Sequence, residues 1–586
     1  MAIPSKPVGW HADDQLVQTG RVSRRGFLHR ATGAALVGTA GVSLLLVACG
    51  QPPAQAGSST AGTAPRGNAG VGASTTSGAH AARVALPTRL PFQGPKAELA
   101  GDDAAGVPSG YLKFPPGLVK TVLEAPGKGG EITAFTPTFQ PPPTPMEQNA
   151  AWQAVNKRLN TTLKIPIVAV PDYPTRLATI TSGSDLPDLV RVANTSVTLQ
   201  DLPRFLESTC ADLSPHLSGD ASKQYPNLAN LPPYAWPSAI FNGKLYCIPS
   251  PASRPGPVLQ AKGALLDSIG VKEFANIDDF TRVCKQLAIP GQRYAFSSYP
   301  GTPTLIWFQQ VFGAPNVWRE SGGKLTRDIE TEEYKAAVST MRGLWDQGLI
   351  NPDAPTMQIN QIAATWYSGK SLFWLLTGRQ FYITYPRATA QDPDFRPRLI
   401  PPFRHDGQNG GFSYLSSGNG LLALKKASPE RVKELLGVLN FLAAPFGSEE
   451  YLLVKYGVKD VDFAFDGNGN PLPTPQGVND LYAPWFNIAS PPAATFDPNP
   501  DIVTQTYEAD KACIARGLAN PVDGLYSKTN GEKGVILDRK VTDGVNEIIY
   551  GRSELGTLDQ VVKSWRADGG DQIRGEYEQA LQESTR

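Results

Sequence analysis

Four aromatic residues lie in loops or near the ends of predicted strands, where a ligand can reach them: Tyr299, Trp307, Trp366 and Trp485. A sugar ring has apolar C–H faces and hydroxyl edges, so flat aromatic faces flanked by polar groups suit it. For any one of the four, a position in the hydrophobic core is an equally good interpretation. Ligand contact is therefore predicted for the group rather than for a single member.

A second set of candidates is polar and stands at the ends of predicted apolar strands. Its members are Asn194, Thr195, Arg254, Arg379 and Asn419. Amide, hydroxyl and guanidinium groups can hydrogen-bond the hydroxyls or carboxylates of a ligand. The alternative for the two arginines is a salt bridge at the surface or between domains. Together the two sets predict a site for a neutral or mildly acidic oligosaccharide.

Catalytic motifs are missing around these candidates. No GxSxG turn occurs, and none of the five histidines stands in an HExxH context. Gly369, Lys370 and Ser371 have the order that ends a P-loop, but Ala364 stands where the first glycine of that loop would be. The sequence therefore predicts no catalytic residue, and a binding protein rather than an enzyme.

Metal and redox sites are not indicated either. Asp466, Asn468 and Asn470 match the start of a calcium loop, but Pro471 replaces its glycine and Gly477 its terminal glutamate. A polar hairpin turn is the favoured interpretation, and a structural calcium ion is the weaker alternative. No Cys/His spacing is typical of a zinc site, so no metal and no cofactor are expected. Buried thiols are predicted for most of Cys210, Cys247, Cys284 and Cys513.

The elements that position the candidates begin with a β-α-β-α-β order. Apolar alternation predicts strands over 131–139, 163–170 and 188–192, and helical spacing predicts helices over 147–160 and 173–182. This order implies a parallel sheet with right-handed crossovers, and ligands bind beyond the carboxyl ends of such strands. Asn194 and Thr195 directly follow the third strand, which places them near the predicted site.

Further elements follow in the same α/β style. Helices are predicted over 276–288, 331–347, 429–443, 558–565 and 571–581, and strands over 258–261, 371–376 and 419–424. The body from residue 130 has more than four hundred residues, too many for one core, so at least two lobes are expected. The formal net charge of +1 offers no electrostatic case for nucleic acid as a partner.

The first fifty residues carry signals for export. Arg24 and Arg25 stand before an uncharged run over 31–48, and the pair resembles a twin-arginine signal. The run ends in Leu-Val-Ala-Cys at 46–49, which resembles a bacterial lipobox, where the cysteine is lipidated and becomes the first residue. An ordinary helix that holds a cysteine is the weaker alternative. We predict a signal peptide over 1–48 and lipidation of Cys49, which anchors the chain at the outer face of the cytoplasmic membrane.

Residues 49–129 are predicted to be a tether. The part up to residue 79 is almost wholly Gly, Ala, Ser, Thr, Pro and Gln, which cannot bury enough apolar surface to order itself. The part over 81–128 has more apolar residues and can lie along the body in extended form. No regular structure is predicted for either part.

Several phrases of the body resemble the extracytoplasmic solute-binding lipoproteins of ABC importers, in the branch that binds oligosaccharides. They are SGSDLPD at 182–188, YPNL at 225–228, NGKLY at 242–246, FGAPNVW at 312–318, LWDQGLINPD at 344–353 and IIYG at 548–551. Each phrase is weak alone, and their order behind a lipobox carries the resemblance. Cys247 departs from the pattern, because the family often has glycine there.

The resemblance implies a two-lobed α/β fold of the periplasmic-binding-protein type 2, with a central cleft between the lobes. We expect one lobe to take 130–250 and 399–445, and the other 251–398 and 446–586. It also implies a monomer that captures an oligosaccharide and delivers it to the membrane subunits of an ABC permease. The alternatives are a secreted, lipid-anchored carbohydrate-active enzyme and a peptide-binding receptor.

Overall fold

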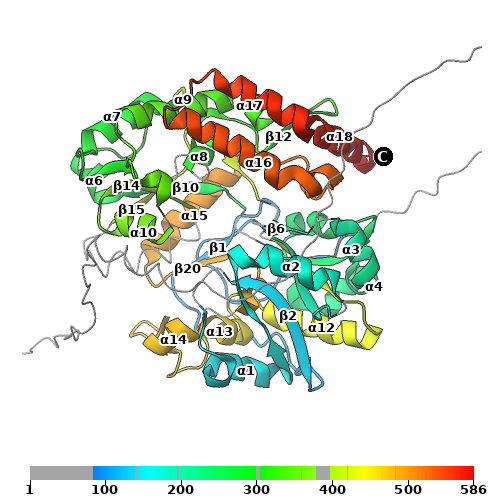
Figure 1. Cartoon of the computed structure of the whole chain (residues 1–586). Coiled ribbons are helices and arrows are strands. Elements are labelled where there is room, and N and C mark those ends of the chain that lie inside the picture. The colour runs from blue at the N-terminus through cyan, green and yellow to red at the C-terminus, as the bar shows by residue number, and fades with distance from the viewer. Residues whose placement is uncertain are drawn as a thin grey trace, which may run out of the picture. The chain divides into compact units, whose positions relative to one another are not determined.

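The computed structural model describes residues 84–585, apart from 139–141, 184, 195–196, 200, 252–253, 299–303, 358, 378–395, 409, 417, 419 and 482–483. Two sheets organise this part of the chain, one of seven strands and one of four. The helices of Figure 1 gather around these sheets in two groups. Among the predicted functional residues, Cys49, Thr195, Tyr299, Arg379 and Asn419 fall outside the described residues.

The seven-stranded sheet is the centre of what we call the first lobe. Its order is β3-β2-β5-β17-β9, with β4 beside β2 and β6 beside β5. The strands are β2 (Glu131–Thr138), β3 (Thr162–Lys164), β4 (Ile167–Ala169), β5 (Leu189–Asn194), β6 (Val197–Thr198), β9 (Cys247–Pro249) and β17 (Gly420–Leu424). β2 is parallel to β3, β4 and β5, as the β-α-β-α-β order predicts, whereas β17 runs antiparallel to β5 and β9.

The helices of the first lobe are α1 (Ala150–Leu159), α2 (Tyr173–Ser182), α3 (Leu202–Thr209), α4 (Ser214–Leu217), α5 (Pro226–Ala229), α12 (Pro429–Leu442), α13 (Glu449–Tyr456) and α14 (Pro475–Asp480). Three of them, α1, α2 and α12, lie close to the bounds predicted for them, and the others were not predicted. Asn149 caps α1 by accepting a hydrogen bond from the Trp152 N–H, and Asn160 ends it in a left-handed conformation. Pro429 opens α12, where a proline loses no helical hydrogen bond.

The four-stranded sheet is the centre of the second lobe, in the order β11-β14-β10-β15. Its strands are β10 (Pro257–Lys262), β11 (Tyr294–Phe296), β14 (Ser371–Thr377) and β15 (Pro397–Ile400). Its helices are α6 (Gly263–Ser268), α7 (Ile277–Leu287), α8 (Thr304–Phe312), α9 (Glu332–Asp346), α10 (Ile359–Tyr367), α15 (Pro500–Ile514), α16 (Lys528–Ile549), α17 (Thr557–Trp565) and α18 (Asp571–Thr585). Asn276 and Thr331 cap α7 and α9, as their positions predict.

Short two-stranded ladders complete the fold. They are β1 (Ser109–Tyr111) with β20 (Ala494–Phe496), β7 (Ile240–Phe241) with β8 (Lys244–Leu245), β12 (Trp318–Ser321) with β13 (Lys324–Arg327), β16 (Ser413–Tyr414) with β21 (Gly517–Leu518), and β18 (Phe463–Phe465) with β19 (Pro471–Pro473). The last pair is the hairpin predicted around residues 466–470. No helix in the described part of the chain is long and apolar enough to cross a bilayer.

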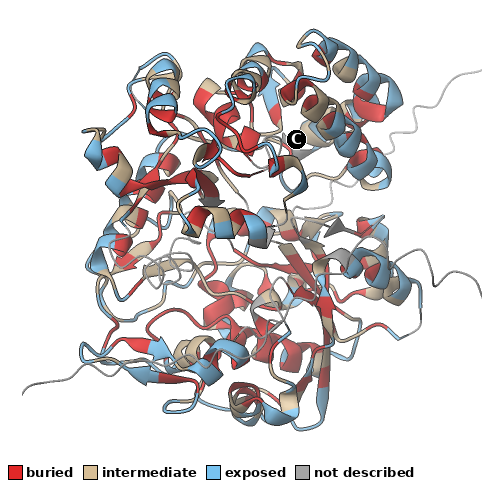
Figure 2. Cartoon of the chain, turned by 60° about the vertical axis from the view of Figure 1, so that its left-hand side comes forward, coloured by how far each residue is buried: buried red, intermediate tan, exposed pale blue. Residues whose placement is uncertain are grey.

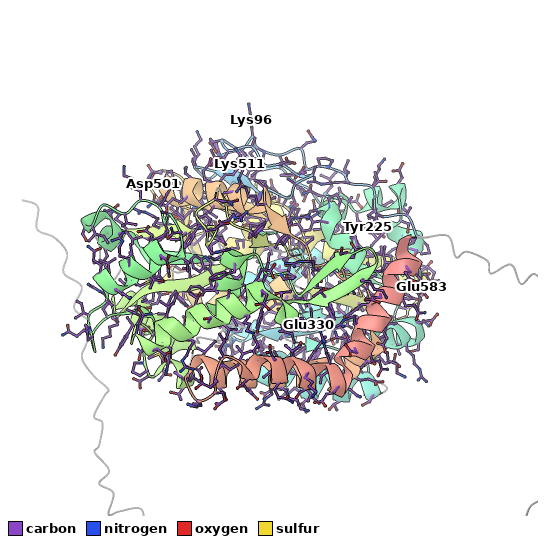
Figure 3. All side chains as sticks on the ribbon, turned by 90° about the horizontal axis from the view of Figure 1, so that it is seen from above. Lys96, Tyr225, Glu330, Asp501, Lys511 and Glu583 are labelled. Atoms are coloured by element: carbon purple, nitrogen blue, oxygen red, sulfur yellow. The ribbon has the colours of Figure 1, made fainter. Side chains whose placement is uncertain are left out.

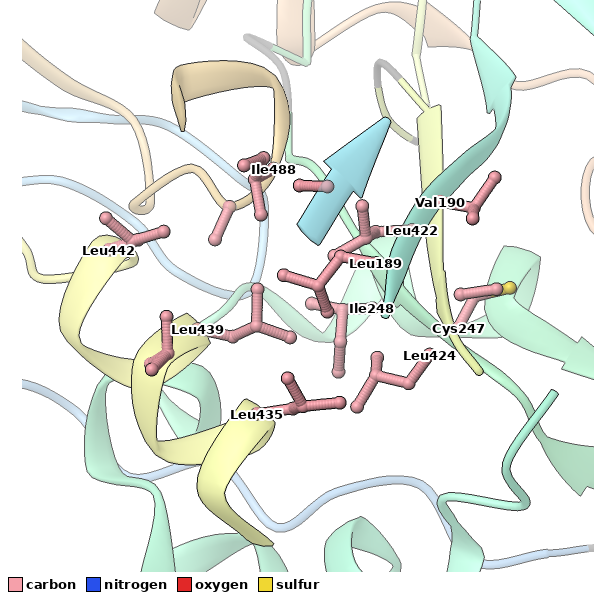
Figure 4. Close-up of a cluster of buried hydrophobic side chains, with 14 of the residues drawn as sticks. Leu189, Val190, Cys247, Ile248, Leu422, Leu424, Leu435, Leu439, Leu442 and Ile488 are labelled. Carbon is pink, nitrogen blue, oxygen red and sulfur yellow. The ribbon is translucent and has the colours of Figure 1, made fainter. Parts of the chain in front are cut away.

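Each lobe has its own buried core, drawn in red in Figure 2. In the first lobe, Leu435, Leu439 and Leu442 of α12 pack on the sheet residues Leu189 and Ile248 (Figure 4). The second core surrounds Phe280, whose ring lies among those of Phe274, Phe296, Phe308 and Phe373. Segments 250–256, 401–419 and 490–499 connect elements of one lobe to elements of the other.

The predicted lobe boundary at residues 445 and 446 stays a prediction, and the cores divide the chain somewhat differently. Val454, Trp485 and Ile488 belong to the core of the first lobe. Ile400 belongs to the core of the second lobe, because β15 pairs with β10. The segment that returns to the first lobe therefore packs in its core as far as residue 489.

Candidate ligand-binding site

Four strand ends meet at one edge of the first sheet. Because β2 and β5 are parallel, Thr138 and Asn194 end at the same side. β17 starts at this edge, since Gly420 lies opposite Asn194 in the antiparallel register. Ser250 follows β9 and donates its backbone N–H to the Gly420 carbonyl over 2.9 Å. The end of β5 at Asn194 and the start of β17 at Gly420 thus lie at one edge, whereas the predicted Asn419 falls outside the described residues.

The guanidinium of Arg191 lies beneath this edge. Arg191 sits within β5 and is only 1% exposed. Its Nη1 donates to the Asn487 carbonyl over 2.6 Å and reaches the Ser250 hydroxyl over 3.5 Å. A Cβ at Gly420 would clash with the Ala193 carbonyl oxygen and come within 2.6 Å of Arg191 Nη2, so the close approach of β17 to β5 at this point requires glycine. Arg191 therefore extends along its strand toward the predicted site.

Burial determines the pKa of the Arg191 side chain. Burial lowers the pKa of Arg191 to about 10, and the neighbouring Tyr173 acts in the opposite direction. The Tyr173 hydroxyl donates to the Arg191 carbonyl over 2.5 Å, and burial raises the pKa of Tyr173. Arg191 is therefore protonated and Tyr173 neutral at pH 7, which gives the sheet edge a fixed positive charge.

Asn487 joins this edge to a segment far along the chain. It ends the short 3-10 helix η8 (Pro484–Asn487), and its Nδ2 donates to the Pro137 carbonyl over 2.9 Å. Its own carbonyl accepts from Arg191 and, over 3.5 Å, from the Thr136 hydroxyl. The pair Arg191 and Asn487 was not among the predicted residues. The lone arginine inside the apolar run LVRVAN could have singled out Arg191, but nothing in the sequence marks Asn487 as its partner.

A second polar cluster follows β11 in the second lobe. The Asn351 amide donates to the Ser297 hydroxyl over 3.3 Å, and the backbone N–H of Ser297 donates to Ser371 Oγ over 3.1 Å. The hydroxyls of Ser298 and Thr304 lie 2.8 Å apart at the start of α8. These buried bonds fix both ends of the connection 299–303, in which the predicted Tyr299 stands.

The three predicted tryptophans within the described chain are all 0% exposed. Trp307 packs among Phe280, Phe308 and Phe403 in the second core. Trp366 packs with Trp374 beside β14, and the Lys262 ammonium lies 4.9 Å from its ring centroid. Rings enclosed in this way offer no face for stacking in the conformation described. That a ligand contacts them stays a prediction.

Trp485 has a clear structural role in the first core. Its Nε1 donates to the Val454 carbonyl over 3.1 Å, and its ring lies 5.7 Å from that of Trp152. It is the second residue of η8 and stands two residues before Asn487 in sequence. Trp485 therefore supports the segment that carries Asn487, behind the sheet edge.

Arg254 lies in the connection 250–256 between the lobes. Its guanidinium stacks on Tyr234, with 4.6 Å from the guanidinium carbon to the ring centroid. Its carbonyl accepts from the Ser416 N–H over 2.8 Å, which ties two of the connecting segments together. Arg254 is thus placed at the junction of the lobes, whereas Arg379 lies outside the described residues.

The segment around Asp466 is a closed hairpin turn, as the favoured interpretation of its sequence predicts. Oδ1 of Asp466 accepts from the N–H groups of Asn468 and Asn470, each over 2.8 Å, and Oδ2 accepts from the Asn470 amide. Within the described residues no group of three or more His, Cys, Asp or Glu side chains is arranged to hold a metal ion. The four described cysteines are buried, free thiols.

Comparison with known proteins gives both sequence relatives and structural neighbours, although no family model matches the chain. Polygalacturonan/rhamnogalacturonan-binding protein YtcQ of Bacillus subtilis (strain 168) is 26% identical over 472 residues, 76% of this chain and 89% of that protein. Lipoprotein LipO of the same organism is 23% identical over 499 residues, 79% of this chain and 95% of that protein.

Among solved structures, the N-glycan transport solute binding protein (NgtS) from Streptococcus pneumoniae superposes with a TM-score of 0.57. The identity is 13%, and the match covers 78% of this chain and 98% of that one. At this identity the likeness establishes the fold alone. The predicted α/β fold of two-lobed solute-binding proteins and the resemblance to their sequences are thus confirmed.

Proposed function

We propose that this chain, a homologue of solute-binding lipoproteins with their two-lobed fold, captures an oligosaccharide between its lobes and delivers it to an ABC permease. The relative YtcQ is named for binding polygalacturonan and rhamnogalacturonan, and the structural neighbour NgtS for N-glycan transport. Both names support a saccharide as the ligand class.

The proposal rests on the polar edge of the first sheet, where β2, β5, β9 and β17 meet. Its groups are neutral hydrogen-bonding side chains, with the charge of Arg191 fixed beneath them. Hydroxyl groups of a sugar both donate and accept, so mixed amides and hydroxyls match them. A positive charge close by favours a ligand that carries carboxylates, such as a uronate, over a cationic one.

The second lobe supplies the opposite wall in this proposal. Thr304 begins α8 next to the connection 299–303, and Arg254 lies where the lobes join. We assign ligand contacts to Asn194, Thr195, Tyr299, Arg254, Arg379 and Asn419, and we place the three buried tryptophans behind them as support.

Export and anchoring complete the proposal. The signal peptide 1–48 directs export, and lipid on Cys49 holds the protein at the outer face of the cytoplasmic membrane. The name of the relative LipO supports a lipoprotein. The body acts as a monomer, and the permease subunits are its protein partners.

Calorimetry of the purified body tests the ligand class against oligogalacturonates, neutral oligosaccharides and short peptides. We expect binding of at least one saccharide, no binding of peptides, and no turnover of the saccharide on prolonged incubation. Asn194→Ala should weaken binding, whereas Arg204→Ala, an exposed change on α3, should not. Peptide binding alone would favour the receptor alternative, and turnover would favour a carbohydrate-active enzyme.

A further inference from the structure

The segment 84–130, which we call the strap, is bonded to the body along its length. At its start, the Thr88 N–H donates to the Gly219 carbonyl over 2.9 Å and the Leu90 N–H to the Ala229 carbonyl over 3.0 Å. Both acceptors belong to the first lobe. This part of the predicted tether therefore lies along the first lobe at its start.

The far end of the strap returns to the first lobe. The backbone and hydroxyl of Thr121 both donate to the carboxylate of Glu450, over 3.0 and 2.8 Å, and Glu450 is only 1% exposed. The Lys128 N–H donates to the Glu434 carboxylate over 2.8 Å, and the Gly127 N–H to the Leu159 carbonyl over 2.8 Å. Buried carboxylates that accept several N–H groups make firm anchors.

The middle of the strap contacts the second lobe. The Tyr507 hydroxyl of α15 donates to the Ala100 carbonyl over 2.8 Å. α15 packs on the second sheet, because Ile502 and Cys513 share a cluster with Val258 and Leu399. In Figure 3, Lys96 of the strap lies on the same side of the molecule as Lys511 of α15. The strap thus has both ends on one lobe and its middle on the other.

Two of the three connecting segments are also bound by the strap. β1 pairs in parallel with β20, which lies in the connection 490–499, with Ser109 opposite Ala494. Gly106, at φ +84°, lies against Arg254 of the connection 250–256. A Cβ at residue 106 would come within 2.6 Å of Arg254 Cδ and 3.0 Å of the Tyr234 ring.

We propose that the strap restrains the segments that connect the two lobes. By doing so, it holds the ligand-free cleft close to its ligand-binding geometry. Lobes that move about connecting segments must change the geometry of those segments. A chain fixed to both lobes and to two connections narrows the range of lobe positions in the ligand-free protein. Binding then costs less ordering entropy, so the strap raises affinity without touching the ligand.

A matched glycine pair tests this proposal in the full mature chain. Gly106→Val inserts a side chain against Arg254, whereas Gly117→Val changes a strap residue whose Cβ would meet nothing within 4 Å. Amide hydrogen exchange of the ligand-free protein should rise about 5-fold or more at Arg254, Gly256 and residues 413–416 in Gly106→Val and not in Gly117→Val. X-ray scattering should show a broader range of lobe separations in the same variant.

Tyr507→Phe serves as a second, milder variant, because it removes one hydroxyl from a residue at the surface. With an oligogalacturonate as the probe, its affinity should fall about 2- to 10-fold, the range that the loss of one hydrogen bond covers. Unchanged exchange at the connecting segments in both variants would overturn the proposal, as would a rise spread evenly over α12 and the rest of the fold. The exchange and scattering measurements need no ligand, so they decide the matter even if no saccharide binds.

Discussion

The Nη1 of Arg191 donates to the carbonyl of Asn487 over 2.6 Å, and this bond joins β5 to a segment almost three hundred residues further on. Asn487 in turn donates to the Pro137 carbonyl of β2. One buried guanidinium thereby fixes the connection after α14 onto the sheet edge that we propose as the ligand site.

Arg191→Met should destabilise the protein, because it leaves the Asn487 carbonyl buried without its charged donor. The loss of such a bond costs about 1.5–3 kcal/mol of unfolding free energy. Urea denaturation followed by tryptophan fluorescence measures this change. Arg204→Ala, which removes an 85% exposed arginine side chain, is the control and should stay within about 0.5 kcal/mol. Equal stability of the two variants would contradict the structural role of Arg191.

The alternation of strands and helices was enough to predict the parallel part of the first sheet, because its segments have clear periods, whereas β6 and β9 were not predicted. Tyr173–Ser182 is a helix with the predicted bounds, and the strand predicted at 188–192 is β5. The long helix α16 was not predicted. Gly531, Gly534 and Gly544 interrupt its sequence, and glycine weakens a helical pattern that only tertiary packing then rescues.

The site was harder to predict than the fold, because burial depends on contacts between distant segments. Trp307 and Trp485 stand near loops in the sequence, but packing across the core encloses their rings. Arg191 and Asn487 meet only through the fold, and no spacing in the sequence links them. The predicted strand ends do meet in the fold, since the register puts Gly420 opposite Asn194, but ligand contact at this edge stays a prediction.

The connection 490–499 holds an acidic group that should make stability depend on pH. Burial raises the pKa of Asp497 to about 6, although its carboxylate accepts from the Asn499 N–H over 2.8 Å. Between about pH 4 and 6 the folded chain therefore binds a proton that the unfolded chain has released, so stability falls as the pH rises through this range.

Asp497→Asn keeps the acceptor for Asn499 and removes the charge. We expect this variant to be more stable at pH 7, by up to about 3 kcal/mol, and to lose the decline between about pH 4 and 6. Thermal unfolding at several pH values measures both effects. The nearby Asp501→Asn changes an exposed aspartate of α15 and should leave the decline in place. A wild-type protein whose stability is flat over this range would contradict the assignment.

Asp462 and Asp480 form a buried pair of carboxyl groups that should respond in the same direction. Both are 0% exposed, and Oδ1 of Asp462 and Oδ2 of Asp480 have no donor. Burial and the neighbouring Asp480 raise the pKa of Asp462, so Asp462 binds a proton more tightly in the folded state and the stability that this contributes is lost as the pH rises.

Asp480→Asn supplies an N–H donor where two acceptors meet. It keeps the oxygen that accepts from the Gln476 amide over 2.9 Å. We expect a gain of about 1–3 kcal/mol at pH 7, the usual cost of an unsatisfied buried group, and a smaller dependence on pH. Asp480→Ala is the comparison, because it removes the repulsion but also the bond to Gln476. If Asn at this position destabilises the protein as much as Ala does, the pair does not share a proton.

Export and lipidation are checked in cells. Cys49→Ala should block lipid attachment and leave an uncleaved precursor, since we propose that its thiol carries the lipid. Arg24→Lys together with Arg25→Lys should stop export, because the resemblance to a twin-arginine signal rests on that pair. Fractionation and labelling with a fatty acid distinguish the two defects. Normal maturation of both variants would refute the assignment of residues 1–49.

Substitutions of Trp485 distinguish a role in the hydrophobic core from a role in ligand binding. Trp485→Ala should cost about 3–5 kcal/mol of stability, because it removes a fully buried indole. Trp485→Phe keeps most of the ring but loses the bond from Nε1 to the Val454 carbonyl, which costs about 1 kcal/mol. Since the ring lies behind the sheet edge, we expect saccharide affinity in Trp485→Phe to remain within about 2-fold of the wild type, measured by calorimetry well below the melting temperature. If Trp485→Phe loses more saccharide affinity than its loss of stability explains, Trp485 is a ligand contact after all. Trp307→Phe provides the same comparison in the second lobe.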